Sequence, residues 1–259
     1  MIISLITSLG NATIRFCTVT GRFILFFYNT IKTIFCSKLP FAKIAEQMNR
    51  IGIHSLLIAI ITGIFAGAVL AYQSYEGFRK FGGENFLGAI VALSMIRELG
   101  PVLTGLMVTG RAGSLIAAEI GTMRITEQID ALKTLGINPF QYLIIPRIIG
   151  ATLIMPFLTL FAMMAGISGG YIISVYFLGL TPDAYISHIK EITNAFDVIG
   201  GLIKGAFFGL ILSWVGCYKG YYASGGARGV GLATTESVVA GSILIIIANY
   251  FLALLLFGA

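Results

Sequence analysis

LGAIVALSMIRELGPVLTGLMVTG (residues 87–110) is an apolar run that is long enough to cross a membrane, and it carries Arg97, Glu98 and Pro101 near its middle. A hydrocarbon core about 30 Å thick is crossed by about 20 helical residues. A charge at that depth costs roughly 2.5 kcal/mol or more, so charged side chains there belong in a protein interior or along a water-filled path. We therefore infer a protein that moves something across or out of a membrane.

The composition supports a helical membrane protein. Of 259 residues, 57% are hydrophobic and 11% are charged, and the mean hydropathy is +0.93. Such a chain lacks the polar surface that a soluble globule of this size needs. Its apolar runs are continuous over about 20 residues, whereas the strands of a membrane barrel would alternate over about ten. We predict an all-α integral membrane protein that forms one domain over residues 1–259.

Five apolar segments are predicted to cross the membrane, over residues 51–74, 86–112, 143–180, 198–218 and 236–258. The third is longer than a straight span requires. It forms either one tilted helix kinked around Pro156 or two short helices that turn at residues 166–170, and we favour one helix. In the first span, Gly63 and Gly67 form a GxxxG pair, which permits another helix to approach closely.

The first 50 residues are predicted to form an interfacial helix and a linker. Polar residues at steps of three, four and seven form one helical stripe, at Thr7, Asn11, Arg15, Thr18, Arg22, Asn29 and Lys32. This pattern is typical of an amphipathic helix that lies in the membrane interface. The alternative is a poorly placed first span, because residues 23–28 are strongly apolar.

Residues 114–136 are predicted to form an amphipathic helix outside the membrane. They hold too many charges to cross it, at Glu119, Arg124, Glu127, Asp130 and Lys133. Apolar residues nevertheless keep helical spacing, at Ile125, Ile129, Leu132 and Leu135. The helix could lie on the lipid headgroups, but an anionic leaflet would not attract its acidic groups, so we favour a protein partner.

The N-terminus is predicted to be cytoplasmic. Five spans put the termini on opposite sides, and Lys and Arg are enriched in cytoplasmic segments. With the N-terminus inside, three basic residues lie outside (Arg79, Lys80, Lys190) and twelve inside (Arg15, Arg22, Lys32, Lys38, Lys43, Arg50, Arg111, Arg124, Lys133, Arg147, Lys219, Arg228). The net charge of +6 therefore reflects topology, and no basic cluster interleaved with aromatic residues indicates nucleic acid.

No motif indicates a reaction carried out by this chain. It has no GxxxxGK[ST] phosphate loop, no GxSxG motif and no HExxH motif. His54 and His188 are predicted at opposite membrane faces, and the three cysteines have no metal-binding spacing. We therefore expect a non-catalytic protein without a cofactor or a metal of its own.

Arg97 and Glu98 are the best local candidates for function. Adjacent residues on a helix point about 100° apart, so each needs a partner on another helix, a lipid headgroup or water. Pro101 has no N–H group, so the carbonyl of Arg97 loses its helical partner and a kink or polar opening follows. The pair either fixes packing at a subunit interface or lines and gates a substrate path.

The run from Val91 to Pro146 contains RELGPVLTGLMVTGRAGSLIAAEIGTMRITEQIDALKTLGINPFQYLIIP, which closely resembles the signature region of the MlaE/YrbE-type permeases. These are the membrane subunits of MCE-associated ABC transporters, which move phospholipid between the membranes of diderm bacteria and have relatives in plastid envelopes. The resemblance covers most of the chain, including the N-terminal helix and the five spans. It identifies residues 1–259 as a single permease domain.

The resemblance implies a homodimer bound by two cytoplasmic ATPase subunits and capped outside by a ring of MCE-domain lipid-binding proteins. ATP would be bound and hydrolysed by the partner, and the transport would maintain outer-membrane lipid asymmetry. The location implied is the inner membrane, or the plastid inner envelope for a plastid-encoded chain. Residues 114–136 resemble the coupling helix, with ATPase contacts at Glu119, Arg124, Glu127 and Asp130.

The family's lipid cavity lies between the two protomers and is lined by the first two spans. The matching positions are Leu70, Gly77, Phe78, Phe81, Arg97, Glu98 and Leu99. Gly77 and Phe81 differ from the aliphatic and tyrosine residues associated with those places, which puts the pocket shape in doubt. The alternatives to lipid transport are a membrane channel and a membrane scaffold.

Overall fold

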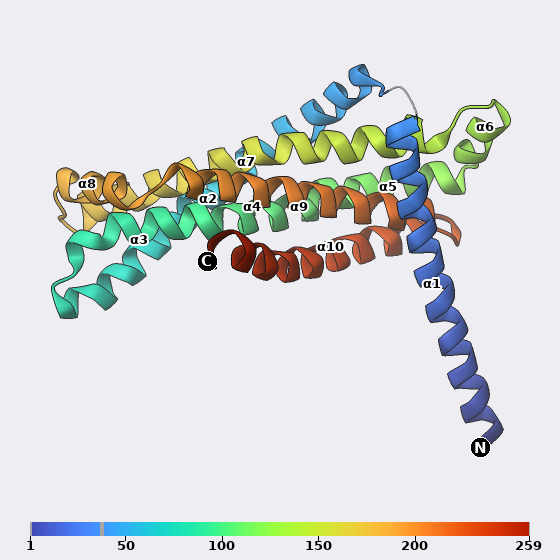
Figure 1. The fold of residues 1–259 in the computed structure, drawn as a ribbon, viewed down its shortest axis with the longest axis horizontal. Helices are drawn as coiled ribbons and strands as arrows, with labels where there is room; N and C mark the ends of the chain where they lie inside the picture. The colour runs from blue at the N-terminus through green and yellow to red at the C-terminus, as the bar shows by residue number, and fades with distance from the viewer. Residues whose placement is uncertain (1, 37–38, 259) are drawn as a thin grey trace.

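The computed structural model describes residues 2–36 and 39–258, apart from the side chains of residues 2–9, 11–13, 15–17, 19, 36 and 81. Its long helices run side by side along the molecule, with α6 at one end and α8 at the other (Figure 1). Among the described residues there is no strand, and five helical segments are long and apolar enough to cross a membrane. The predicted all-α membrane fold is therefore confirmed.

The five segments differ from the predicted spans mainly at their ends. They are α2 (Phe41–Phe78), Glu84–Ile125, Phe140–Phe177, α9 (Ala195–Tyr221) and α10 (Gly226–Phe257). The third consists of η5 (Phe140–Ile144), α7 (Ile145–Ile172) and η6 (Ile173–Phe177), with Pro156 inside α7. It is one long helix, as favoured, and the short helix α8 (Pro182–Ile192) connects it to α9.

The second segment is a continuous helix with two wider turns. Its pieces are η2 (Glu84–Phe86), α3 (Leu87–Ser94), η3 (Met95–Leu99), α4 (Gly100–Val108), η4 (Thr109–Gly113) and α5 (Ser114–Ile125). Both η3 and η4 are π-helical turns. Single π turns inside α-helices occur frequently at functional sites.

Residues 114–136 do not form one surface helix. Residues 114–125 form α5, which continues the second span, and α6 (Gln128–Thr134) follows a break. At the break Glu127 has a φ of 60°, which ends the helical path. The early turns of α5 carry Ile116 and Ile120, which are buried in the main hydrophobic core, so this part is held in the bundle instead of on its surface.

Helices α2 and α7 approach each other closely through small residues. A side chain at Gly67 would overlap the backbone carbonyl of Gly166, and a Cβ at Gly63 would lie 2.5 Å from the carbonyl oxygen of Ala162. The contact is reciprocal, because a side chain at Gly169 would overlap the backbone of Ile64. The predicted close approach at the GxxxG pair is thus confirmed.

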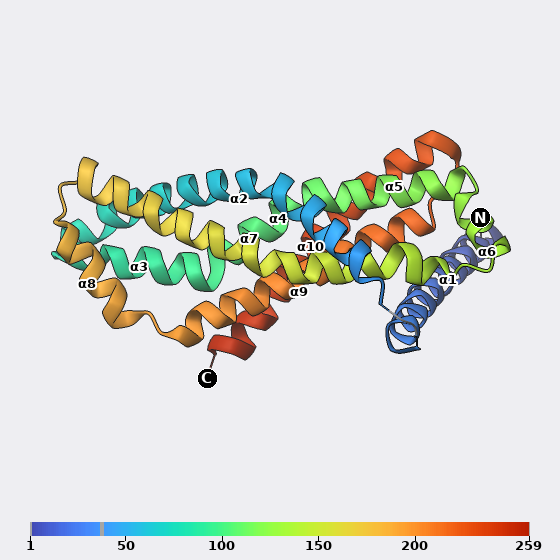
Figure 2. The same ribbon diagram turned by 90° about the horizontal axis from the view of Figure 1, so that it is seen from above.

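Helix α1 (Ile2–Cys36) lies across the end of the bundle that carries α6. It leaves the spans at a steep angle and carries the N-terminus away from them (Figures 1 and 2). Its buried residues Phe26, Thr30 and Thr33 repeat at helical intervals and form one face. Within the predicted polar stripe, the side chains of Thr7, Asn11 and Arg15 lie outside the described residues.

Phe26 anchors α1 to the bundle. Its ring is fully buried and lies 5.3–6.3 Å, between ring centroids, from the rings of Phe140, Trp214, Tyr218, Tyr221 and Tyr222. Aromatic pairs at such distances add to the stabilisation from buried area. The amphipathic pattern of α1 predicted a helix, but it did not indicate this aromatic site.

We expect Phe26→Ala to loosen α1 from the bundle, because truncating a buried phenylalanine costs about 3–5 kcal/mol. Trp214 is the single tryptophan of the chain and contacts the rings of both Phe26 and Phe27, so its emission should shift to longer wavelength. Phe35→Ala is the matched control, since Phe35 is on the same helix and 84% exposed. Equal emission from both variants would contradict the anchor.

Candidate substrate path and coupling loop

Glu98 binds two side chains from other spans. Lys204 Nζ of α9 lies 2.7 Å from Glu98 Oε1, and Asn249 Nδ2 of α10 donates to Glu98 Oε2 at 2.8 Å. Lys204 is fully buried, whereas the Glu98 side chain is 40% exposed. The carboxylate therefore joins three helices and still reaches the surface of the chain.

Lys204 also takes up the carbonyl that Pro101 leaves free. In an α-helix the N–H group of residue 101 would bind the carbonyl of residue 97, and proline lacks that group. Lys204 Nζ donates to the Arg97 carbonyl at 2.9 Å instead, and the π turn η3 lies at this point. The carbonyl that Pro101 leaves without a helical partner is thus bound by the buried ammonium group of Lys204.

Arg97 pairs with a buried aspartate. Its guanidinium donates to Asp197 Oδ1 through Nε at 2.8 Å and through a terminal nitrogen at 2.7 Å. Asp197 is 2% exposed and also accepts the backbone N–H of Asn194, within a capping box at the start of α9. The four charged groups Arg97, Glu98, Asp197 and Lys204 sum to zero, so this network places no net charge in the membrane.

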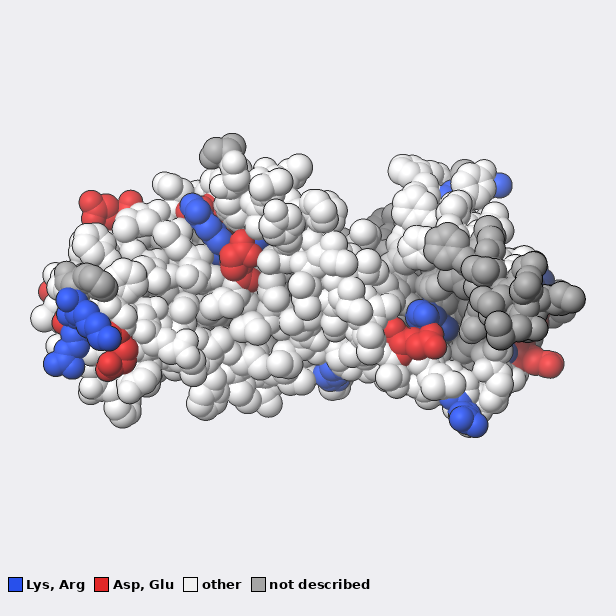
Figure 3. Space-filling view, turned by 90° about the horizontal axis from the view of Figure 1, so that it is seen from below, with Lys and Arg blue, Asp and Glu red and all other residues white. Residues whose placement is uncertain are grey.

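We call Arg97, Glu98, Asp197, Lys204 and Asn249 the polar network. Asp197 and Lys204 are seven residues apart, so the network extends about two helical turns along α9. Figure 3 shows charged side chains gathered toward the two ends of the molecule, with a mixed blue and red cluster also present within the largely white band between them. The sequence analysis singled out Arg97 and Glu98, and the structure identifies their partners Asp197, Lys204 and Asn249 on other helices.

The other predicted lipid-path residues lie in two places. Leu70 and Leu99 pack against the same buried cluster of Ala71, Val91 and Met95. Gly77 has open space around it, and Phe78 is 41% exposed at the last residue of α2. Phe81 ends the short helix η1 (Arg79–Phe81), and its side chain lies outside the described residues.

An apolar hollow lies close to the same end of α2. It has a volume of about 570 Å³ and is lined by Ala68, Val69, Tyr72, Gln73, Ile173, Phe177 and Leu178. These residues come from α2, from η6 and from the residue after η6, and none of them belongs to the predicted lipid-path set. The hollow is of a size that suits small apolar ligands.

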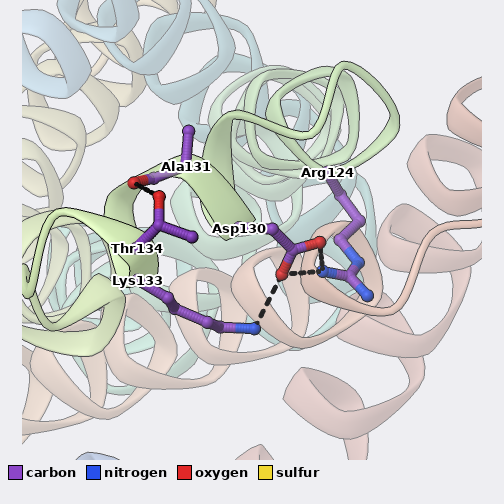
Figure 4. Close-up of polar contacts among 5 residues, drawn as sticks. All are labelled: Arg124, Asp130, Ala131, Lys133 and Thr134. Atoms are coloured by element: carbon purple, nitrogen blue, oxygen red, sulfur yellow. Dashed lines mark hydrogen bonds and ion pairs between the residues drawn. The ribbon is translucent and has the colours of Figure 1, made fainter.

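The turn between α5 and α6 is held together by its own charges. Arg124 donates to both oxygens of Asp130 at 2.9–3.0 Å, and Lys133 Nζ lies 2.9 Å from Asp130 Oδ1 (Figure 4). The hydrogen bond from Lys133, followed by the charge of Arg124, lowers the pKa of the Asp130 carboxyl. Ile129 is fully buried beneath this surface and Leu132 packs against the same core, so α6 is fixed to the bundle by apolar side chains.

The four predicted coupling residues differ in whether other side chains of this chain bind them. Arg124 and Asp130 bind each other, and Glu119 is bound by Arg50 at 2.7 Å and by Arg147 at 3.0 Å. Glu127 is exposed at the break between α5 and α6. Of the four, Glu127 is therefore the carboxylate best placed to meet a partner.

The comparisons with known proteins agree with the sequence resemblance. The family model described as Permease MlaE matches residues 44–255. A probable ABC transporter permease protein of Rickettsia felis is 47% identical over 257 residues, which cover 99% of each chain. The intermembrane phospholipid transport system permease protein MlaE of Haemophilus influenzae is 34% identical over 260 residues, which cover 100% of each chain.

A plant protein is related over a shorter part of its own length. The chloroplastic protein TRIGALACTOSYLDIACYLGLYCEROL 1 of Arabidopsis thaliana is 36% identical over 215 residues, which cover 83% of this chain and 61% of that protein. The family model and the bacterial relatives each account for most of this chain. The chain is therefore an integral membrane protein that belongs to the MlaE family of ABC transporter permeases.

Proposed function

We propose that this chain is the membrane subunit of an ATP-driven transporter that moves phospholipids between the inner and outer membranes and so maintains outer-membrane lipid asymmetry. The observation that carries the proposal is its similarity, over the full length of both chains, to the intermembrane phospholipid transport permease of Haemophilus influenzae. The chain itself binds no cofactor, and a cytoplasmic partner subunit hydrolyses ATP. It lies in the inner membrane with its N-terminus in the cytoplasm.

The polar network supports a lipid path at this place. Arg97 and Glu98 are 38% and 40% exposed, so each presents part of its charge at the surface while its partners fix its position. A phospholipid needs both a polar group for its headgroup and apolar surface for its chains. Leu70 and Leu99 provide adjacent apolar surface, and together with Phe78, Gly77 and Phe81 they form the proposed path.

The outward faces of the spans support a homodimer. Only 11% of the most apolar window of α10 and 22% of that of α2 is buried within one chain, against 56% for α9. Small and apolar faces of this kind pack against another helix or against lipid. Because α10 also contributes Asn249 to the polar network, a second copy seated on α10 would bring two such networks near one lipid path.

The two ends of the bundle suit different partners. The α6 end carries the exposed Glu127 and the paired charges of the α5–α6 turn, and we propose that the ATPase subunit binds here. The opposite end carries α8 and the apolar hollow beside α2, and we propose that an MCE-domain protein covers it. This orientation agrees with the excess of basic residues at the α6 end of the spans.

Glu127→Lys is expected to weaken ATPase association at least ten-fold, because it reverses an exposed carboxylate, whereas Glu119 and Asp130 are already bound by basic side chains. Affinity purification with quantification of the co-purified ATPase measures this. Glu84→Lys makes the same charge reversal in η2, at the α8 end, and should retain the ATPase. Full association of the Glu127 variant would remove the proposed contact.

Reconstitution tests the proposal as a whole. The subunit should co-purify from gently solubilised membranes with an ATPase, an MCE-domain protein and phospholipid, identified by mass spectrometry. In proteoliposomes the assembly should move labelled phospholipid only with ATP present. ATP-independent ion flux from the same vesicles would favour a channel, and a chain isolated without partners or lipid would favour a scaffold.

A further inference from the structure

A cavity of about 530 Å³ lies beneath α1, away from the polar network. Its polar lining consists of Thr18 and Arg22 of α1, Lys219 and Tyr222 near the end of α9, Ser224, and Glu236 of α10. Two stretches that are distant in sequence, residues 18–22 and 218–236, thus line one space. Its volume is within the range of sites that hold small ligands.

The walls of this cavity favour an anion. The guanidinium carbon of Arg22 lies 5.7 Å from the centre of the Tyr222 ring, and Lys219 Nζ lies 2.7 Å from Glu236 Oε2. The lining charges Arg22, Lys219 and Glu236 sum to +1. The first turn of α10 begins at Gly226 with no side-chain cap that the structure records, so its amide groups add partial positive charge next to Ser224.

The hydroxyl groups of the cavity can donate to such an anion. Tyr222 and Ser224 each provide one donor, whereas the Thr18 hydroxyl already donates to the Ile14 carbonyl at 2.8 Å. Burial, with the neighbouring Tyr221 and Tyr218, raises the pKa of the Tyr222 hydroxyl, so this group stays protonated at neutral pH. Oxygen atoms that carry negative charge, such as those of a phosphate group, are well matched by this set of cations and hydroxyl groups.

The position of the cavity indicates where the anion comes from. It lies at the ends of two spans, where α9 stops at Tyr221 and α10 starts at Gly226. The aromatic rings near these helix ends are those of Tyr218, Tyr221, Tyr222 and Trp214. Tyrosine and tryptophan are enriched at the depth of the lipid headgroups. A headgroup can therefore enter the cavity while its acyl chains remain in the bilayer.

We propose that this cavity binds the phosphate of an anionic lipid headgroup, with Arg22 as the principal cation and Tyr222 as a hydrogen-bond donor. The bound lipid joins α1 to the corner between α9 and α10. It is a resident lipid at the α6 end, separate from any lipid that passes the polar network. The proposal requires only that the chain lies in a membrane, so it does not depend on the proposed transport function.

Quenching of Trp214 tests the proposal. Trp214 is the single tryptophan and lies one helical turn from Tyr218. The full chain is reconstituted in phosphatidylcholine vesicles with increasing fractions of phosphatidylglycerol whose acyl chains are brominated, and in matched vesicles in which the phosphatidylcholine is brominated. At equal fractions of brominated lipid, quenching by phosphatidylglycerol is divided by quenching by phosphatidylcholine. This preference ratio measures how strongly the site selects the anionic lipid.

The expected preference of the natural chain is about five-fold, because one basic side chain near an anionic lipid contributes an interaction of that size. Arg22→Gln should bring the ratio close to one. Glu236→Gln should increase it by a similar factor, because it removes the negative charge and frees Lys219. Arg228→Gln removes a positive charge from the first turn of α10 but not from the cavity lining, and should leave the ratio unchanged.

Three results would overturn the proposal. A ratio near one in the natural chain excludes the anionic lipid, and an equal loss in the Arg22 and Arg228 variants would mean that only general surface charge acts. Displacement of the quenching by millimolar inorganic phosphate would assign the cavity to free phosphate instead of lipid. Opposite shifts in the Arg22 and Glu236 variants would support the site, since damage to the fold cannot move the ratio in both directions.

Discussion

Lys204→Met is expected to lower phospholipid transport at least ten-fold and the free energy of unfolding by about 2–3 kcal/mol. Lys204 is fully buried and donates to both Glu98 and the Arg97 carbonyl. Methionine fills a similar volume but leaves the carbonyl unpaired and Glu98 bound by Asn249 alone. The loss of stability stays below the range for a fully buried ion pair, because Glu98 is 40% exposed.

A second substitution separates structure from transport. Adding Glu98→Gln to Lys204→Met removes the unpaired charge, and most of the lost stability should return. Transport should not return if the carboxylate of Glu98 contacts the substrate. Thermal unfolding in detergent and lipid transfer in proteoliposomes measure the two effects on the same preparations.

Lys190→Met is the matched control, since Lys190 is exposed on α8 near the same end of the bundle. It should change neither stability nor transport. If the double variant recovers transport together with stability, the polar network only fixes packing. If Glu98→Gln alone prevents two copies of the chain from associating, the network belongs to the subunit interface.

The membrane fold could be predicted because its signal is local. About 20 consecutive apolar residues identify a span without knowledge of its neighbours. The effect of Pro101 was also local, since a missing N–H group frees a carbonyl four residues earlier. The sequence therefore predicted both the five spans and a polar opening at Arg97.

The partners of that opening could not be predicted, because they depend on how distant helices pack. Asp197 lies in the first turn of α9 and Asn249 lies in α10, a hundred or more residues from Arg97 and Glu98. The spacing of Asn194 and Asp197 was a usable sign of a helix start, since an acidic residue three positions after an N-cap forms a capping box. A lone asparagine in an apolar run gave no comparable indication of its partner.

The ends of two helices were predicted wrongly, because glycine-rich or charged residues there do not look like part of a membrane span. The last span was predicted to begin at residue 236, but α10 already begins at Gly226, within a glycine-rich stretch. A side chain at Gly229 would overlap the backbone carbonyl of Ser224, so this glycine permits the first turn of α10 to lie close to the segment that precedes it. Likewise, residues 114–136 were predicted to lie outside the membrane because they are charged, but α5 packs in the core of the bundle.

Gly67→Val is expected to lower the stability of the fold by about 3 kcal/mol or more, the upper end of the range for overpacked sites. The added Cβ would meet the backbone carbonyl of Gly166, and no change of rotamer can move a backbone atom away. Helices α2 and α7 would have to separate along their whole contact, including the approach of Gly169 to the backbone of Ile64.

Gly77→Val makes the same change on the same helix, where nothing lies within 4 Å of the added Cβ. It should unfold at nearly the temperature of the natural chain, while the Gly67 variant should unfold much lower or fail to yield monodisperse protein. Equal unfolding temperatures would mean that α2 and α7 tolerate a wider separation. There is little hydrophobic driving force between helices in lipid, so their association depends on close packing. If the valine side chain forces α2 and α7 apart, few new contacts should replace those that are lost.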